Sequence, residues 1–184
     1  MKTGLEFNPL THSYRYEGRP LPSVTGIIST VIPRQWNADE WCLERGRMVH
    51  RALALYLDGN LDFDSLDPRI VDRVQAGIMA IRAFGWKAGI IEQPMVHPVF
   101  LYCGMPDFIS DTGDLCDWKG IIEATVEIQL GFYALLAEAN KIKIKRLFAI
   151  QTADKGYKAQ AFDLRRSKAL AVSFLGVYGW MAKQ

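Results

Sequence analysis

The chain has 184 residues, of which 49% are hydrophobic, and it contains nine Phe, seven Tyr and five Trp. This composition excludes an intrinsically disordered protein and predicts a single domain over residues 1–184 with an ample core. No apolar run approaches the roughly 20 residues of a membrane span. The first residues lack the basic and apolar regions of a secretory signal. We therefore expect a cytoplasmic protein with no membrane partner.

The charge of the chain is small overall but unevenly distributed. The formal net charge is +2, yet residues 1–140 hold 12 basic and 18 acidic residues, whereas residues 141–168 hold nine basic and two acidic residues. A basic segment beside an acidic one fits a polyanion that lies over a cation site. An ordinary solvated strand edge and helix face explains the same pattern equally well.

In the N-terminal half, residues 1–88, we expect a β-hairpin over residues 5–22, followed by three helices. Ser23 is placed to cap a short helix that Pro33 ends, and residues 37–40 have capping-box spacing at the start of a longer helix. The helices are expected over residues 23–32, 37–57 and 67–86.

The C-terminal half, residues 89–184, changes from helical to strand periodicity and back. Alternating and apolar runs predict strands, and Asp163 is placed to cap a last helix. The order predicts an α/β domain with a mixed central β-sheet flanked by helices. Strands are expected over residues 90–100, 101–110, 114–119, 141–150 and 157–162, and helices over 125–140 and 163–180.

The segment Asp117-Trp118-Lys119 carries the clearest chemical signal. In a strand, Asp117 and Lys119 point to one face and Trp118 to the other. Asp107 lies ten residues earlier in another strand-like run. Two carboxylates that hold a divalent cation, with a lysine beside them, are the parts needed for phosphodiester hydrolysis. Taken alone, an Asp-x-Lys triplet is more often a strand end with a surface ion pair.

Four further side chains are candidates for the same site. His50 follows Gly46 by four residues in the helix over 37–57, and Gln129 and Tyr133 share a face of the helix over 125–140. Glu92 starts the first strand and is a candidate second-metal ligand or supporting acid. Each has an ordinary alternative, such as a hydrogen-bonded histidine, a polar helix face or an exposed edge acid.

In this order the motifs resemble the RecB-type branch of the PD-(D/E)XK nuclease superfamily. The four motifs are Gly46–His50, Gly104–Asp107, Asp117–Lys119 and Gln129–Tyr133. Residues 7–14 and 21–25 are similar to the opening of phage exonuclease-like members and of mitochondrial genome maintenance exonucleases. The resemblance covers residues 7–162 and implies a restriction-endonuclease-like core.

The resemblance also implies roles for these residues. Mg²⁺ or Mn²⁺ would be held by Asp107, Asp117, His50 and the backbone carbonyl of Trp118. Lys119 would orient the attacking water and stabilise charge on the phosphate. Gln129 and Tyr133 would hold the DNA backbone or Lys119.

Two departures from the family pattern stand out. Gly120 replaces the Thr that family members often have after the lysine. The iron–sulfur subgroup uses four cysteines, whereas this chain has only Cys42, Cys103 and Cys116, so no cluster is expected. We expect these three to be reduced, mostly buried thiols.

The sequence thus predicts a metal-dependent deoxyribonuclease, an exonuclease acting on DNA ends or single strands. Its setting would be recombination, repair or phage DNA processing, in the host cytoplasm if phage-encoded, with a recombination protein as a possible partner. The alternatives are a structure-specific endonuclease, a non-catalytic DNA-binding protein of the same fold, and an unrelated α/β domain in which the motifs are coincidental. No feature predicts an oligomeric state.

Overall fold

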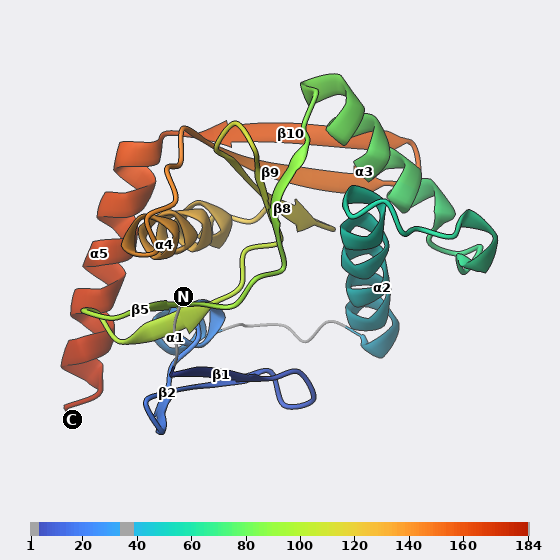
Figure 1. Ribbon diagram of the computed structural model, residues 1–184. Coiled ribbons are helices and arrows are strands. Elements are labelled where there is room, and N and C mark those ends of the chain that lie inside the picture. The colour runs from blue at the N-terminus through green and yellow to red at the C-terminus, as the bar shows by residue number, and fades with distance from the viewer. Residues whose placement is uncertain (1–3, 34–38, 184) are drawn as a thin grey trace.

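The computed structural model describes residues 4–33 and 39–183 (Figure 1). Its centre is a sheet of five strands: β4 (Ala88–Ile91), β7 (Phe108–Ser110), β8 (Asp114–Lys119), β9 (Arg146–Ala153) and β10 (Gly156–Phe162). The strand order is β10-β9-β8-β7-β4. β8 and β9 run parallel, and the other neighbouring pairs are antiparallel. The predicted α/β fold with a mixed central sheet is confirmed.

Helices cover both faces of this sheet (Figure 1). The helices are α1 (Val24–Val31), α2 (Glu40–Leu57), α3 (Val71–Phe84), α4 (Thr125–Ala139) and α5 (Leu164–Met181), with a 3₁₀ turn at Phe63–Ser65. One buried cluster joins the sheet to α4, against which α1 and α5 pack, and a second joins the other face to α2 and α3. Each face therefore has its own apolar core.

Two small sheets lie outside the central one. The hairpin expected over residues 5–22 is present and gains a third strand. A two-stranded pair lies between β4 and β7 in the chain. The strands of the first sheet are β1 (Leu5–Asn8), β2 (Ser13–Tyr16) and β3 (Arg19–Leu21), and those of the second are β5 (Met95–His97) and β6 (Tyr102–Gly104).

The two long strands expected over residues 90–100 and 101–110 are wrong, because each is divided in two. Pro94 and Pro106 lack the backbone donor that a continuous ladder needs, and Glu92 has a left-handed φ of 41°. Both chain segments therefore leave the central sheet and pair again as β5 and β6. Asp107 lies where the returning segment joins the central sheet at β7.

The strand expected over residues 141–150 begins late. Lys141 has a left-handed φ of 64°, and residues 142–145 are irregular. The amide of Lys145 donates to the carbonyl of Gly113 in the turn before β8, at 2.7 Å. This turn contact replaces strand pairing, so β9 starts only at Arg146.

Side-chain caps define several helix starts. Ser23 accepts a hydrogen bond from the amide of Gly26, and Asp163 accepts one from the amide of Arg166, as predicted. The cap of α2 is Asp39, which accepts from the amide of Cys42, while Asn37 lies outside the described residues. α3 begins at Val71, later than expected, because residues 67–70 form a turn closed by the Ile70 amide and the Asp67 carbonyl.

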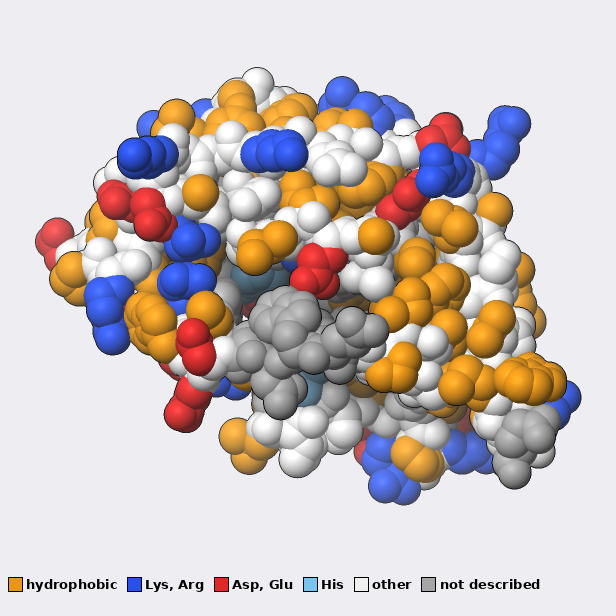
Figure 2. All heavy atoms as spheres, turned by 180° about the vertical axis from the view of Figure 1, so that it is seen from behind, with side chains coloured by type: hydrophobic (Ala, Val, Ile, Leu, Met, Phe, Trp, Pro, Cys, Tyr) orange, Lys and Arg blue, Asp and Glu red, His pale blue; other side chains and the backbone are white. Residues whose placement is uncertain are grey.

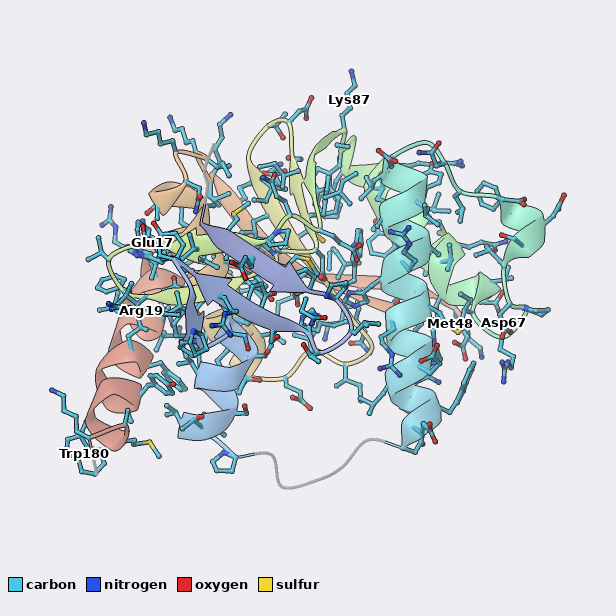
Figure 3. The ribbon with its side chains drawn as sticks, turned by 60° about the horizontal axis from the view of Figure 1, so that its bottom comes forward. Glu17, Arg19, Met48, Asp67, Lys87 and Trp180 are labelled. Atoms are coloured by element: carbon cyan, nitrogen blue, oxygen red, sulfur yellow. The ribbon has the colours of Figure 1, made fainter. Side chains whose placement is uncertain are left out.

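Helix α5 presents an apolar surface. Figure 2 shows hydrophobic side chains gathered over this part of the molecule, and its exposed members include Val172, Val177, Trp180 and Met181. Trp180 lies at the C-terminal end of α5 (Figure 3). Within the parts of the chain that the structure describes, no helix is both long and apolar enough to cross a membrane.

We predict that Gly131→Ala strongly destabilises the fold. A Cβ atom at Gly131 on α4 would lie 2.0 Å from the backbone oxygen of Ser167 on α5, so the two helices would have to separate. The expected loss is about 3 kcal/mol of unfolding free energy, measured by urea denaturation. Gly176→Ala is the control, because Gly176 is helical and exposed. Apart from the adjacent residues and backbone of α5 itself, no described atom lies within 4 Å of the position that a Cβ would take there. That variant should gain about 1 kcal/mol. Equal stability of the two variants would contradict the role of Gly131.

Candidate active site

The site forms where β7 begins and β8 ends. The antiparallel pair Phe108 and Cys116 places Asp107 next to the last residues of β8. The Asp107 carboxylate fixes this arrangement, because its Oδ2 accepts a 2.8 Å hydrogen bond from the amide of Trp118. Asp107 and Asp117, ten residues apart in the chain, are thereby held close together, as the predicted cation site requires.

Residues of β8 alternate between the two faces, as the sequence predicts. Trp118 is 2% exposed and packs in the core beneath α2 and α3. Asp117 faces α4, where Gln129 Nε2 donates to its Oδ1 at 3.3 Å. Lys119 Nζ lies 2.6 Å from Asp117 Oδ2, so the two side chains form a largely buried ion pair.

His50 reaches the site from α2, on the other side of the sheet. Its Nδ1 lies 3.3 Å from Asp107 Oδ1. The Asp107 carboxylate therefore contacts both the backbone of β8 and the side chain of α2. The His50 of the Gly-x-x-x-His motif and the Asp107 of the Gly-x-x-Asp motif meet, although 57 positions separate them in the chain.

Gln129 and Tyr133 line the α4 side of the site. Gln129 Nε2 lies 3.1 Å from the Tyr133 hydroxyl, so one amide contacts both Tyr133 and Asp117. Gly104 on β6 lies against Tyr133. A Cβ at Gly104 would lie 2.9 Å from side chains of both α4 and α1, so close packing on these two helices explains this glycine.

The charges of the site shift its pKa values in opposite directions. Burial raises the pKa of Asp117 to about 6, and Asp107 acts in the same direction against the opposing effect of Lys119. Burial also disfavours ionisation of Asp107, but His50 outweighs it and lowers the pKa of Asp107. His50 in turn has its pKa raised to about 9, because Asp107 outweighs the effect of burial. Asp107 is thus ionised at neutral pH beside a cationic His50.

Glu92 is half-buried close to Asp107. Its backbone amide donates to the Asp107 carbonyl at 3.1 Å. Burial, and then the Asp107 charge, raise the pKa of its carboxyl group. Glu92 therefore adds a third acid to the neighbourhood of the site.

The donor set fits a divalent cation by its chemistry. Asp107 and Asp117 supply hard oxygen ligands, and the raised pKa of Asp117 reflects burial and carboxylate repulsion that a cation would relieve. Among the described residues, no three His, Cys, Asp or Glu side chains already form a metal-binding group. Cation binding would compete with the contacts that His50 and Lys119 make to these carboxylates.

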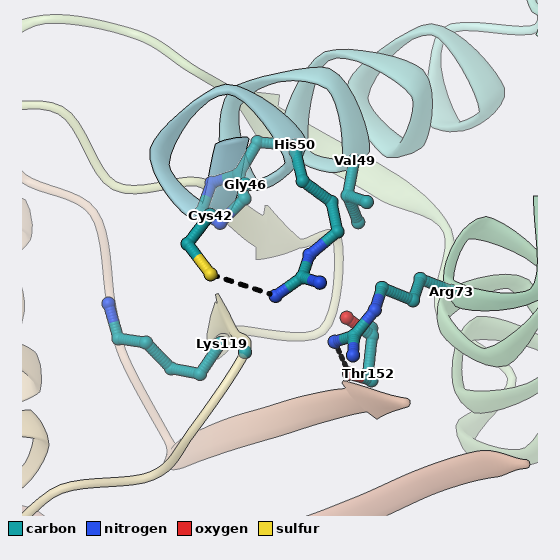
Figure 4. Close-up of a pocket in the computed structure, with 9 residues that line it drawn as sticks. Cys42, Gly46, Val49, His50, Arg73, Lys119 and Thr152 are labelled. Carbon is teal, nitrogen blue, oxygen red and sulfur yellow. Dashed lines mark hydrogen bonds between the residues drawn. The ribbon is translucent and has the colours of Figure 1, made fainter. Parts of the chain in front are cut away.

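The structure also reveals a cationic cavity that the sequence did not indicate. Its volume is about 80 Å³, and it is lined by Cys42, Arg45, Gly46, Val49, His50, Arg73, Lys119, Gly120 and Thr152. Figure 4 shows the Arg73 side chain directed toward Thr152 at the end of β9. Arg45 adjoins Gly46 of the Gly-x-x-x-His motif, so the sequence could have indicated it as a residue of the site. Nothing in the sequence indicated Arg73, because it comes from a different helix.

The basic segment 141–168 is partly neutralised. Arg146 pairs with Asp114, Arg166 with Glu127 and Lys168 with Glu138. These three side chains therefore already have acidic partners within the protein.

Comparisons with known proteins give only distant structural similarity. No protein-family model matches the sequence, and no curated protein matches it. The fold is similar to a candidate exonuclease from Eubacterium rectale, with 12% identity, a TM-score of 0.48, and coverage of 88% of this chain and 75% of that one. It is also similar to the alkaline exonuclease LHK-Exo from Laribacter hongkongensis, with 12% identity, a TM-score of 0.46, and coverage of 88% and 89%. LHK-Exo in complex with dAMP gives 11% identity, a TM-score of 0.46, and coverage of 89% and 90%. Because these scores are low, any assignment of function rests on the side chains of the site.

We predict that Asp117→Asn stabilises the metal-free protein at neutral pH. An unfolded Asp titrates near pH 4, whereas Asp117 titrates at about 6 in the fold, so the native state loses stability as pH rises between these values. Removing this carboxylate should raise the unfolding free energy by about 1–3 kcal/mol at pH 7.5 and change it little at pH 4. Urea denaturation in EDTA across this pH range measures the difference.

Asp107→Asn is the matched control, for which we expect the opposite change in unfolding free energy. The pKa of Asp107 is lowered in the fold, so its charge contributes stability above the unfolded value. This variant should be less stable at pH 7.5. A destabilised Asp117→Asn protein at that pH would contradict the predicted cost of burying the Asp117 charge beside Asp107.

Proposed function

We propose that the protein is a metal-dependent deoxyribonuclease of the PD-(D/E)XK type, from the RecB-type branch. The observation that carries the proposal is the meeting of Asp107, Asp117 and Lys119 at one end of the sheet. A pair of buried carboxylates beside an ammonium group is suited to phosphodiester hydrolysis. The contacts of His50 and Gln129 with the two carboxylates support it further.

In this proposal, Asp107, Asp117, His50 and the Trp118 carbonyl hold Mg²⁺ or Mn²⁺. When bound, the cation would supply Lewis-acid activation and neutralise phosphate charge. The Lys119 ammonium orients the attacking water and stabilises the charge that develops on the phosphate oxygens. Gln129 and Tyr133 hold the Asp117 carboxylate in place through the contacts of the Gln129 amide. Water adds to phosphorus, one P–O bond breaks, and the leaving oxygen takes up a proton.

We further propose that the enzyme is an exonuclease that acts on DNA ends or single strands. The resemblance of residues 7–14 and 21–25 to exonuclease-like relatives supports this mode. A role in recombination, repair or phage DNA processing, with a recombination protein as partner, belongs to the same proposal.

Lys119→Ala should abolish cleavage while the fold is retained. Removing the ammonium group takes away stabilisation of the developing charge, so we expect at least a roughly 100-fold loss of rate. The measurement is cleavage of labelled single- and double-stranded DNA with Mg²⁺, with Mn²⁺ and with EDTA. EDTA should stop the wild-type reaction.

Lys87→Ala is the control for loss of one positive charge. Lys87 is exposed and projects from the edge of the molecule (Figure 3). Its replacement should leave the rate within about twofold, since an exposed charge distant from the reaction has little effect on it. Full activity of Lys119→Ala would rule out the proposed mechanism.

The mode of attack is tested with circular DNA. An exonuclease needs an end, so we expect digestion of linear DNA and no cleavage of a covalently closed single-stranded circle. A circle opened beforehand at one position serves as the positive control. Cleavage of the closed circle would assign the protein to the structure-specific endonucleases instead.

A further inference from the structure

We propose that Arg45, Arg73 and Gly46 form a second phosphate subsite, which holds a nucleic-acid phosphate beside the one that is cleaved. This inference rests on the proposed nuclease function, because it adds a substrate contact to that site. The subsite is the cavity of about 80 Å³ beneath α2, at the ends of β8 and β9.

The cavity concentrates positive charge from separate elements. Arg45 comes from α2 and Arg73 from α3, and both line the same small space with His50. Like charges repel at short range, so their convergence favours an anion between them. Guanidinium groups are suited to phosphate oxygens because their donors form a planar fork.

Arg73 is held in place by the protein. Its Nη1 donates to the Thr152 carbonyl at 2.7 Å, and its Nε lies 3.0 Å from Asp154 Oδ1. The Arg73 side chain is 16% exposed, while that of Asp154 is 71% exposed. A partly buried guanidinium is thus oriented in advance, and the carboxylate that pairs with it is exposed to solvent.

Arg45 is held less firmly by its neighbours than Arg73 is. Its contact in the described structure is Nη2 to the sulfur of Cys42, at 3.6 Å. A thiol is a poor partner for a guanidinium group, so most of the donors of Arg45 remain available to a ligand.

Gly46 gives the second, independent observation. A glycine inside a helix costs about 1 kcal/mol relative to alanine, so it needs a reason. Apart from the adjacent residues and backbone of α2 itself, no described atom lies within 4 Å of a Cβ built at Gly46, yet the residue lines the cavity. Space for a ligand, rather than packing within the described structure, therefore explains this glycine.

The position of the cavity indicates where its phosphate would lie relative to the phosphate that is cleaved. Lys119 and Gly120 line it, so it adjoins the end of the strand that carries Asp117. In Figure 4 the Lys119 side chain extends away from Arg73. Its ammonium group lies 2.6 Å from the Asp117 carboxylate. A phosphate in the cavity and one at the carboxylates would thus lie on opposite sides of the Lys119 side chain.

The test measures binding of a fluorescent single-stranded oligonucleotide by anisotropy in EDTA, across a range of KCl concentrations. Arg45→Gln should weaken binding about tenfold and reduce the slope of log K against log salt by about 0.7, the value for one phosphate contact to a single strand. Arg47→Gln is the matched control, because Arg47 is two residues away on α2, pairs with Glu44 and does not line the cavity. It should leave the slope unchanged.

Gly46→Ala separates a binding role from a structural one. The new methyl group should raise Tm by about 2–4 °C, because alanine is the better helix former, yet weaken oligonucleotide binding several-fold by filling the cavity. Higher stability with unchanged binding would overturn the proposal. So would identical salt slopes for Arg45→Gln and Arg47→Gln.

Oligonucleotides with a 5′-phosphate, a 3′-phosphate or no terminal phosphate identify the source of the bound group. An equal loss of affinity for all three in Arg45→Gln assigns the subsite to an internal phosphodiester. A loss limited to one phosphorylated end assigns it to that terminal monoester. Cleavage by the wild type with Mg²⁺ is measured separately, and absence of cleavage would count against the nuclease function. Unchanged oligonucleotide binding by Arg45→Gln would count against the subsite.

Discussion

The hydrogen bond from the Trp118 amide to the Asp107 carboxylate is the contact on which the site depends. It joins the segment entering β7 to the end of β8, at 2.8 Å, and so places two acids side by side in a buried region. Burial, and to a smaller extent the charge of Asp107, raise the pKa of Asp117. His50 and Lys119 offset part of that charge, one from each side of the sheet. The protein thus keeps an electrostatically unfavourable arrangement because the surrounding sheet and helices hold it in place.

Strand β8 shows how one element serves both stability and chemistry. Asp114 at its start is buried, but Trp86 and Arg146 donate to it and outweigh burial, so its pKa is lowered. Asp117, three residues later, has its pKa raised. Trp118, between Asp117 and Lys119, packs with Trp86 in the core under α2 and α3. The first acid stabilises the strand, whereas the second is held in a buried place that disfavours its charge, which a bound cation would offset.

Helix α2 links the carboxylates to the cationic cavity. His50 contacts Asp107, while one turn earlier Gly46 and Arg45 line the space shared with Arg73. A single helix therefore positions groups of both kinds, and the distance between them is fixed by its 3.6-residue period. The Asp39 side chain caps the N-terminus of α2, close to Arg45 and Gly46.

The sequence by itself determined the features that depend on local periodicity. The opposite faces of Asp117 and Trp118, the caps Ser23 and Asp163, and the shared face of Gln129 and Tyr133 all follow from spacing within one element. The tertiary structure alone decided the division of residues 90–110 into four strands, the late start of β9, and the meeting of His50 with Asp107. It also decided the cavity, since Arg73 is fixed by Thr152, 79 residues away. Such contacts join distant segments, and no local pattern specifies which distant residues will meet once both faces of the sheet are covered.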